Sequence, residues 1–279
     1  MSKVKQLIKD SRLALRDVMQ AELAKIADSL VEDISISLRK STEAQRVNAA
    51  KGISAGGRNA YLALVKTALS VIATDAIEQA RKEVPKAKKV KLSEEIKLAE
   101  FERLPPDVQK RVLAKSQLIV DTQMADLEKA VFFQFSSSVD STDSAALIQK
   151  DLTEAADDFL TGPSIEAGTA TIAADIVNTA RSAFFFTEEV LTEIEAFQFV
   201  NGDPVSPICQ DLAGSIFAKD DPEADRYMPP LHHNCKSYIV PILVGNLKGR
   251  EIGDLKPSSA DLEKFIRLSE QDHTGCDHS

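Results

Sequence analysis

Residues 3–40, KVKQLIKDSRLALRDVMQAELAKIADSLVEDISISLRK, indicate most directly what kind of fold this chain adopts. Their apolar side chains recur in steps of three and four residues, which places them along one side of an α-helix. The stripe consists of Val4, Leu7, Ile8, Leu15, Val18, Met19, Leu23, Ile26, Leu30 and Ile34. It predicts a long helix that faces a core, and the same steps would also suit a coiled-coil seam between copies of the chain.

Similar periodicity predicts further helices as far as Phe197. A second helix is expected over residues 58–83, because Gly52, Gly56 and Gly57 interrupt the pattern and Pro85 stops it. Its buried side would carry Tyr61, Leu64, Ala68, Val71, Ile72 and Ile77. The remaining helices are expected over residues 107–135, 145–160 and 165–197.

The composition of this 279-residue chain is typical of a globular, mainly helical protein. It is 43% hydrophobic and 28% charged, lacks tryptophan and has only 5% aromatic residues, which favours helices over a β-sandwich. The net charge of −9 argues against a general nucleic-acid binder, because phosphate contacts need a basic face. No apolar run reaches the roughly 18 residues that span a bilayer, so we expect no membrane contact.

The N-terminus and the cysteine content bear on where the protein works. The first residues, MSKVKQLIKDSRLALRDVM, alternate charge with Leu and Val and therefore lack the apolar core of a signal peptide. Three cysteines do not make a disulfide framework in a chain of this size. These features predict a protein made and used in a reducing cytoplasm, or in a particle assembled there.

The character of the sequence changes after Val200. Helical periodicity stops, and Gly, Pro and Asp become frequent. Residues 237–244, SYIVPILV, are apolar and β-branched and predict a short strand. We therefore expect a mainly α fold of long amphipathic helices, followed by a small α+β module that contains Cys and His. The expected divisions are a helical region over 1–104, a domain over 105–245 with the Cys/His module at 203–241, and a tail over 246–279 with a short helix at 259–269.

All three cysteines and all four histidines lie between Cys209 and His278. His232 and Cys235 are close enough in sequence to bind one ion together, and Cys209 precedes them in the same module. Thiolate and imidazole ligands together suit zinc, which takes four ligands in a tetrahedron. Asp203, His233, a tail residue or water could supply the fourth ligand. The alternative is a tight loop that prolines and buried thiols stabilise without a metal.

A specific string of residues surrounds these candidate ligands. It consists of Asp203, Ser206-Pro207-Ile208-Cys209, Leu212-Ala213-Gly214, Pro229-Pro230-Leu231-His232-His233-Asn234-Cys235-Lys236-Ser237 and Ile239-Val240-Pro241-Ile242. In order and spacing, this string resembles the C-terminal part of the phage Mu F-like minor head proteins, also called the phage head morphogenesis domain. ADIVNTARSAFF at residues 174–185 resembles the helix that precedes it in the family. Lys236 stands where the family has Arg, and Pro204-Val205 stands where Arg-Thr is often found.

The resemblance implies a bacteriophage minor head protein that acts in head morphogenesis or DNA delivery by binding other proteins, and not as an enzyme. Cys209, His232 and Cys235 would be metal ligands by position, with Asp203 a candidate for the fourth place around a structural zinc ion. The expected partners are the portal protein, the major capsid protein or both. The protein would lie in the head interior or at the portal vertex of the virion, and in the host cytoplasm during assembly.

Other interpretations stay open at this point. Cys209 with His232 or His233 could be a nucleophile and base, which would make the protein an enzyme. The basic run at residues 81–91 could anchor a helical scaffold protein to DNA, or contact packaged DNA weakly. In a minor head protein, the long N-terminal helices over residues 1–104 would be the part that docks on portal or capsid, or that self-associates. A second metal cluster could involve His273, Cys276 and His278, although chain ends of this composition more often lack fixed structure.

Overall fold

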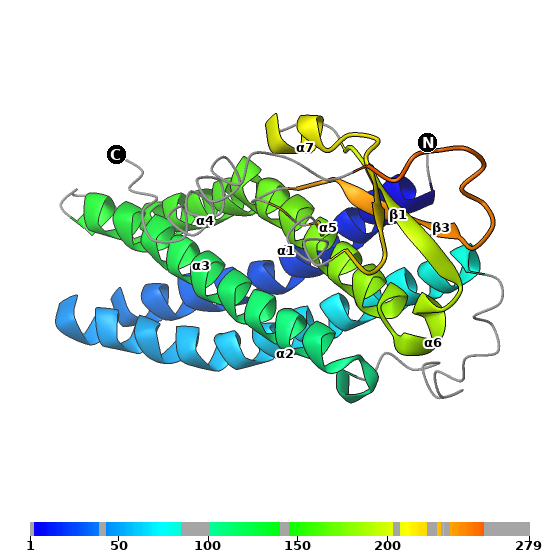
Figure 1. Cartoon of the computed structure of the whole chain (residues 1–279). Coiled ribbons are helices and arrows are strands. Elements are labelled where there is room, and N and C mark those ends of the chain that lie inside the picture. Colours follow the sequence, from blue (N-terminus) through cyan, green and yellow to red (C-terminus); the bar gives the residue numbers. More distant parts are fainter. Residues whose placement is uncertain are drawn as a thin grey trace. The chain divides into compact units, whose positions relative to one another are not determined.

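The computed structural model describes residues 3–38, 43–84, 101–139, 145–202, 207–221, 228–229, 231 and 235–253. Over these residues the chain is mainly α-helical, and a small three-stranded antiparallel sheet lies near its C-terminal end (Figure 1). This architecture confirms the predicted fold class. The helix expected at residues 259–269 lies outside the described residues.

The chain divides into two compact units, and each is assembled from segments that are far apart in the sequence. The helical unit consists of Arg12–Leu69 and Val112–Thr169. The sheet unit consists of Met1–Ser11, Ser70–Arg111 and Ala170–Ser279. The linear division expected from the sequence stays a prediction.

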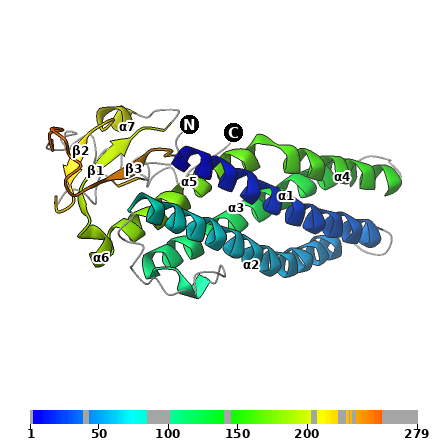
Figure 2. The same ribbon diagram turned by 90° about the vertical axis from the view of Figure 1, so that its right-hand side faces the viewer.

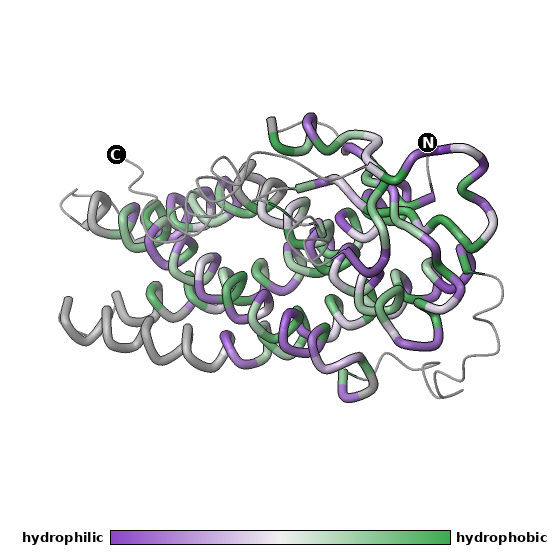
Figure 3. Tube along the Cα trace, viewed as in Figure 1, coloured by the Kyte–Doolittle hydropathy of each residue, from purple (hydrophilic) through white to green (hydrophobic). Residues whose placement is uncertain are grey.

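Helix α1 (Lys3–Leu38) buries the apolar stripe that its sequence predicts. The buried members of the stripe are Val4, Ile8, Leu15, Met19, Leu23, Ile26, Leu30 and Ile34. Figure 3 shows hydrophobic and hydrophilic positions alternating in this way along the described helices. Because the protein itself covers the stripe, a coiled-coil seam is not needed to bury it, and self-association stays a prediction.

Helix α2 (Glu43–Glu83) continues through Gly52, Gly56 and Gly57, so the predicted break at these glycines is wrong. A Cβ at Gly57 would lie only 3.0 Å from Cγ1 of Ile26 on α1, which is closer than an ordinary contact. The glycine therefore allows close approach of the two helices instead of ending one of them. Packing against a neighbour outweighs the low helix propensity of glycine here.

The buried side of α2 differs in part from the predicted one. It is formed by Tyr61, Val65, Leu69, Ile72, Ala73, Ala76, Ile77 and Ala80. Leu64 and Ala68 are only half-buried, and Val71 is exposed. Within the helical unit, the Tyr61 hydroxyl donates a hydrogen bond to Oε1 of Gln123.

The stretch Gly57–Glu83 of α2 is long and apolar enough to cross a membrane by length and composition, a property not expected from the sequence. Half of its most apolar window is buried inside the structure, as in the core helix of a soluble protein. The stretch also contains the charged residues Lys66 and Asp75. Length and composition are therefore weak evidence that this helix crosses a membrane.

The next two helices agree closely with their predictions. A short 3-10 helix, η3 (Phe101–Arg103), precedes helix α3 (Pro106–Val139), which extends beyond the predicted end at residue 135. Proline suits the first turn of α3, because an N–H at that position would have no partner within the helix. Helix α4 (Ala145–Thr161) matches the helix predicted over 145–160.

Helix α5 (Pro163–Phe185) ends well before residue 197, so the last part of the predicted helix 165–197 is wrong. A short helix, α6 (Glu188–Leu191), follows, and strand β1 (Ile194–Val200) comes next. This strand forms backbone hydrogen bonds with two strands that come later in the sequence. Tertiary pairing of this kind overrides local helical periodicity, because strand stability depends on cross-strand neighbours.

Strand β1 is the centre of the sheet (Figure 2). Strands β2 (Ile216–Ala218) and β3 (Tyr238–Leu243) pair with it in antiparallel orientation, in the order β2-β1-β3. Strand β3 confirms the strand predicted over residues 237–244. Phe197 at the middle of β1 lies opposite Phe217 on one side and Pro241 on the other.

The two faces of the sheet are covered by different side chains. On one face, the ring of Phe197 has its centroid 6.1, 5.1 and 5.8 Å from those of Phe185, Phe186 and Phe217. On the other, Leu247 packs against a small buried cluster formed by Ala196, Ile216 and Ile242. Ala196 and Phe197 belong to different layers because successive side chains of a strand point to opposite faces.

Candidate functional site

Cys209 and Cys235, which lie 26 residues apart, meet inside the sheet unit. Cys209 lies on the short helix α7 (Pro207–Asp211), and Cys235 immediately precedes the segment that leads into β3. Their Sγ atoms are 3.8 Å apart, and only 2% and 1% of the two residues is exposed. Neither cysteine forms a disulfide. The structure thus brings together two of the predicted metal ligands.

The distance between the two sulfurs fits a shared tetrahedral ion. Zinc binds thiolates at about 2.3 Å, so two thiolates on one tetrahedral zinc lie about 3.8 Å apart. The observed distance between Sγ of Cys209 and Sγ of Cys235 is 3.8 Å, which also suits a thiol–thiol hydrogen bond. A disulfide would need the two sulfurs at about 2 Å. The residues present therefore fit a metal site with two sulfur ligands.

The protonation of Cys235 follows from the same contact. The pKa of the Cys235 thiol is raised, first by its hydrogen bond with Cys209, then by burial and by repulsion from charge on Cys209. Backbone hydrogen bonds at Leu231 and Ser237 act on this pKa in the opposite direction. Without a cation the Cys235 thiol therefore keeps its proton, and a bound metal would displace it, since the ligand form of cysteine is the thiolate.

A close backbone contact brings the ends of the two motif segments together. A Cβ on Gly202 would overlap the carbonyl oxygen of Lys236, so only glycine fits at this position. The Gly202 N–H also donates to Oγ of Ser237 at 3.4 Å. Asp203 follows Gly202 directly in the sequence, and Cys235 directly precedes Lys236.

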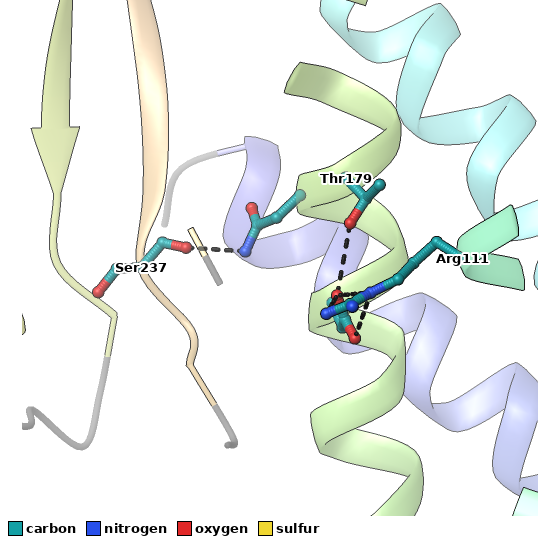
Figure 4. Close-up of polar contacts among 5 residues, drawn as sticks. Arg111, Thr179 and Ser237 are labelled. Atoms are coloured by element: carbon teal, nitrogen blue, oxygen red, sulfur yellow. Dashed lines mark hydrogen bonds and ion pairs between the residues drawn. The ribbon is translucent and has the colours of Figure 1, made fainter. Parts of the chain in front are cut away.

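Asn178 on helix α5 holds the segment that follows Cys235. Its side-chain amide donates a 2.8 Å hydrogen bond to the backbone carbonyl of Ser237, and both residues are buried (Figure 4). Ser237 thus bonds through its hydroxyl to Gly202, two residues beyond the end of β1, and through its carbonyl to α5. These bonds fix the backbone two residues from the Cys235 thiol.

Arg181, one turn further along α5, holds the next part of the same strand. Its guanidinium forms two hydrogen bonds with the Glu83 carboxylate, at 2.8 and 2.9 Å, and donates to the Ile239 carbonyl at 3.2 Å. It also lies 5.2 Å from the centre of the Phe185 ring. Arg181 is only 1% exposed, so this charge depends on Glu83 for its stability inside the protein.

These contacts also cover part of the free edge of β3. Ser237, Ile239 and Pro241 alternate along the strand and so face the same edge. Asn178 and Arg181 bind the first two carbonyls, and Pro241 has no N–H to offer. An edge with occupied carbonyls and a proline is a poorer template for pairing with another strand.

Asp175 forms a second buried polar contact on α5. Its carboxylate accepts hydrogen bonds from Nε of Arg111 at 3.0 and 3.1 Å, and Thr179 contacts it at 3.4 Å (Figure 4). With Asn178 and Arg181, it forms a row of buried polar side chains on one helix. Sequence reasoning missed these roles, although polar residues at steps of three within the apolar stretch 174–185 were the available clue.

The remaining predicted ligands fall outside the description. Asp203, His232 and His233 lie outside the described residues, as do His273, Cys276 and His278 of the tail and most of the basic run 81–91. In the part of the chain that the structure describes, no group of three or more His, Cys, Asp or Glu side chains could hold a metal ion. Within the same part, Oδ1 of Asn201 is a buried acceptor without a hydrogen-bond partner.

No known family model matches this chain, and neither a curated protein nor a solved structure is detectably similar to it. The functional interpretation therefore depends on the motif and on the geometry around the two cysteines.

Proposed function

We propose that this chain is a bacteriophage minor head protein of the Mu F-like family, which acts in head morphogenesis or DNA delivery by binding other head proteins. One observation carries the proposal: the two halves of the motif, Ser206–Cys209 and Pro229–Ser237, each contribute a cysteine to one buried sulfur pair. A string whose separate parts form one local structure is less easily a chance match than a string of letters alone.

We propose further that the sulfur pair belongs to a structural zinc site. Cys209 and Cys235 would be two ligands, His232 the third and Asp203 the fourth. The 3.8 Å between the sulfurs supports the first two assignments. Zinc would stabilise the module when bound, because one ion would join ligands from two segments that are separate in the sequence.

The burial of the sulfur pair favours binding over catalysis. A cysteine nucleophile reacts as a thiolate, and enzymes lower its pKa and leave it accessible. Here both thiols are buried and the pKa of Cys235 is raised. The enzyme interpretation, with Cys209 as nucleophile and His232 or His233 as base, is the second candidate, and turnover by a chain with an intact fold and no metal would favour it.

The helical unit is the part we propose to dock on the portal or capsid protein. Large apolar side chains are exposed on its helices α3 and α4, namely Leu113, Leu118, Phe133 and Leu147. Exposed apolar side chains of this size are common at sites of protein–protein contact. Weak contact with packaged DNA through the basic run, and self-association, remain secondary proposals.

Metal content tests the site. Protein washed with a chelator and reloaded with zinc should retain about one zinc per chain by mass spectrometry, and Cys235→Ser should lose it. Cys276→Ser is the matched control and should bind as the wild type does. Equal zinc in the wild type and Cys235→Ser would contradict the proposed site.

Partner binding tests the function. Co-expressed with portal and major capsid protein of the phage that encodes it, the chain should co-purify with one of them in gel filtration. Phe133→Asp, at a position 73% exposed on α3, should weaken that complex. Val244→Asp in the sheet unit, at a position 60% exposed, is the matched control and should not. Failure of the wild-type chain to bind either protein, and its absence from purified particles, would overturn the proposal.

A further inference from the structure

We infer that Cys209 and Cys235 are also a site of reversible oxidation, where an intramolecular disulfide replaces the metal when zinc is absent and the surroundings are oxidising. The disulfide itself needs only the two thiols. Its competition with zinc, and its timing, rest on the proposed function.

The two sulfurs are already in contact. They lie 3.8 Å apart, and a disulfide requires about 2 Å, so each sulfur needs to move by only about 1 Å. Cys276 is the remaining cysteine of the chain, and it lies outside the described residues. Of the cysteines that the structure describes, Cys209 and Cys235 are therefore a ready pair.

Both segments that carry the thiols are tied to strand β1. On the Cys209 side, the N–H of Gly214 donates to the Phe199 carbonyl at 3.0 Å, and the N–H of Phe199 donates to Ser215 at 2.9 Å. On the Cys235 side, Tyr238 pairs with Val200 at the end of β1, and Ser237 accepts bonds from Gly202 and Asn178. A shared scaffold keeps the thiols near each other and raises their effective concentration, which favours ring closure over reaction with a separate thiol.

The reaction balances with a small disulfide, such as oxidised glutathione, as the oxidant. One cysteine thiolate attacks a glutathione sulfur, so that a mixed disulfide forms and one glutathione leaves. The second cysteine attacks the protein sulfur of that mixed disulfide, the bond between Cys209 and Cys235 forms, and the second glutathione leaves. The two cysteines lose two electrons and two protons, and the two glutathione molecules carry them away as thiols.

Burial of both thiols would make this reaction slow in a reducing cytoplasm. A particle that leaves the cell meets an oxidising medium, where disulfides persist. A bond between residues 26 apart would then restrict the unfolded chain and stabilise the module without a metal. Cys209 and Cys235 would thus bind zinc during assembly and form a disulfide after the particle leaves the cell.

The experiment is a redox titration of the full chain. Chelator-washed protein and zinc-loaded protein are equilibrated at several ratios of reduced to oxidised glutathione, alkylated in denaturant, and weighed intact by mass spectrometry. The metal-free wild type and Cys276→Ser should lose two hydrogens, with Cys209 linked to Cys235 in the peptide map. Cys209→Ser and Cys235→Ser should carry a glutathione adduct instead. The zinc-loaded wild type should keep both thiols free at the same ratios.

The arms separate the two proposals. Glutathione adducts without an internal bond in metal-free wild type would overturn the disulfide, while protection of the thiols by zinc would still support the metal site. An internal bond that forms equally with and without added zinc would support the disulfide and contradict the metal site. A bond that joins Cys276 to either partner would overturn the assignment of the pair.

Discussion

At the residue scale, the site depends on two local constraints, the lack of space for a side chain at Gly202 and the protonation of Cys235. Gly202 has no space for a Cβ, because the Lys236 backbone lies against it. The pKa of the Cys235 thiol is raised by its hydrogen bond with Cys209 and by burial, so it stays protonated. Two experiments follow from these local constraints.

We expect Gly202→Ala to lower the free energy of unfolding by about 1–3 kcal/mol, because the added methyl group must push two backbone segments apart. Urea unfolding followed by circular dichroism measures this. Gly168→Ala on α5 is the matched control, since a Cβ there meets nothing within 4 Å. It should be neutral or stabilising by up to about 1 kcal/mol, since alanine is the better helix former. Equal effects of the two substitutions would contradict the close contact at Gly202.

The raised pKa of Cys235 predicts a loss of stability at high pH in reduced, metal-free protein. The thiol of the unfolded chain releases its proton near the ordinary value of 9.0, while the folded protein retains it. Stability is therefore complete below that pH and falls above it, by roughly 1 kcal/mol per pH unit. Urea unfolding of the wild type should show this slope, and Cys235→Ser should lack it.

The comparison is best made below pH 10.0, because the pKa of Tyr61 is also raised from that value, mainly by burial. Above it, unfolding would release the Tyr61 proton as well. If the wild type and Cys235→Ser lose stability with the same slope between pH 9.0 and pH 10.0, the pKa of Cys235 is not raised in the folded protein.

At the element scale, α5 organises the sheet unit by means of buried polar groups as well as apolar ones. Asn178 and Arg181 bind the edge of β3, and Arg181 pairs with Glu83 at the end of α2. A buried charge with a single ionic partner is costly to leave alone. The stability of the β3 edge should therefore depend on Glu83, which lies 98 positions before Arg181 in the sequence.

Arg181→Met should lower the free energy of unfolding by about 3–5 kcal/mol, because it leaves the Glu83 carboxylate without its partner and the Ile239 carbonyl unpaired. Adding Glu83→Leu should recover part of that loss. Lys150→Ala breaks an exposed ion pair on α4, with both side chains more than 60% exposed, and should cost less than about 1 kcal/mol. A loss at Arg181 no larger than at Lys150 would contradict the structural role of the pair.

At the scale of the whole molecule, the chain combines a helical unit with exposed apolar side chains and a sheet unit with a buried sulfur pair. Neither feature requires a membrane, although part of α2 would be long and apolar enough to cross one. Charged residues within that part and its burial favour a core helix.

We therefore expect the full chain to stay in the lower, vesicle-free fraction of a density gradient after mixing with phosphatidylcholine vesicles. The reason is that the apolar side of α2 is already covered, for example at Val65, Leu69 and Ile72. The same assay with vesicles that contain anionic lipid is the control for the basic run. Flotation with neutral vesicles would contradict the core position of α2.

The sequence alone determined the class of fold, and it singled out the Cys/His region as the candidate site. Helical periodicity depends on neighbours three and four residues away, so the stripe of α1 and the extents of α3 and α4 were predictable. The motif likewise pointed to Cys209 and Cys235 before any geometry was known. The strand β3 followed from a local run of β-branched residues.

Only the tertiary structure decided the features that depend on distant partners. Ile194–Val200 become a strand because later segments pair with them, and Gly57 stays helical because Ile26 lies against it. The contact of Cys209 with Cys235 and the pairing of Arg181 with Glu83 join residues 26 and 98 positions apart. Periodicity reports only which side of an element is apolar, whereas the choice of partner depends on how the whole chain packs.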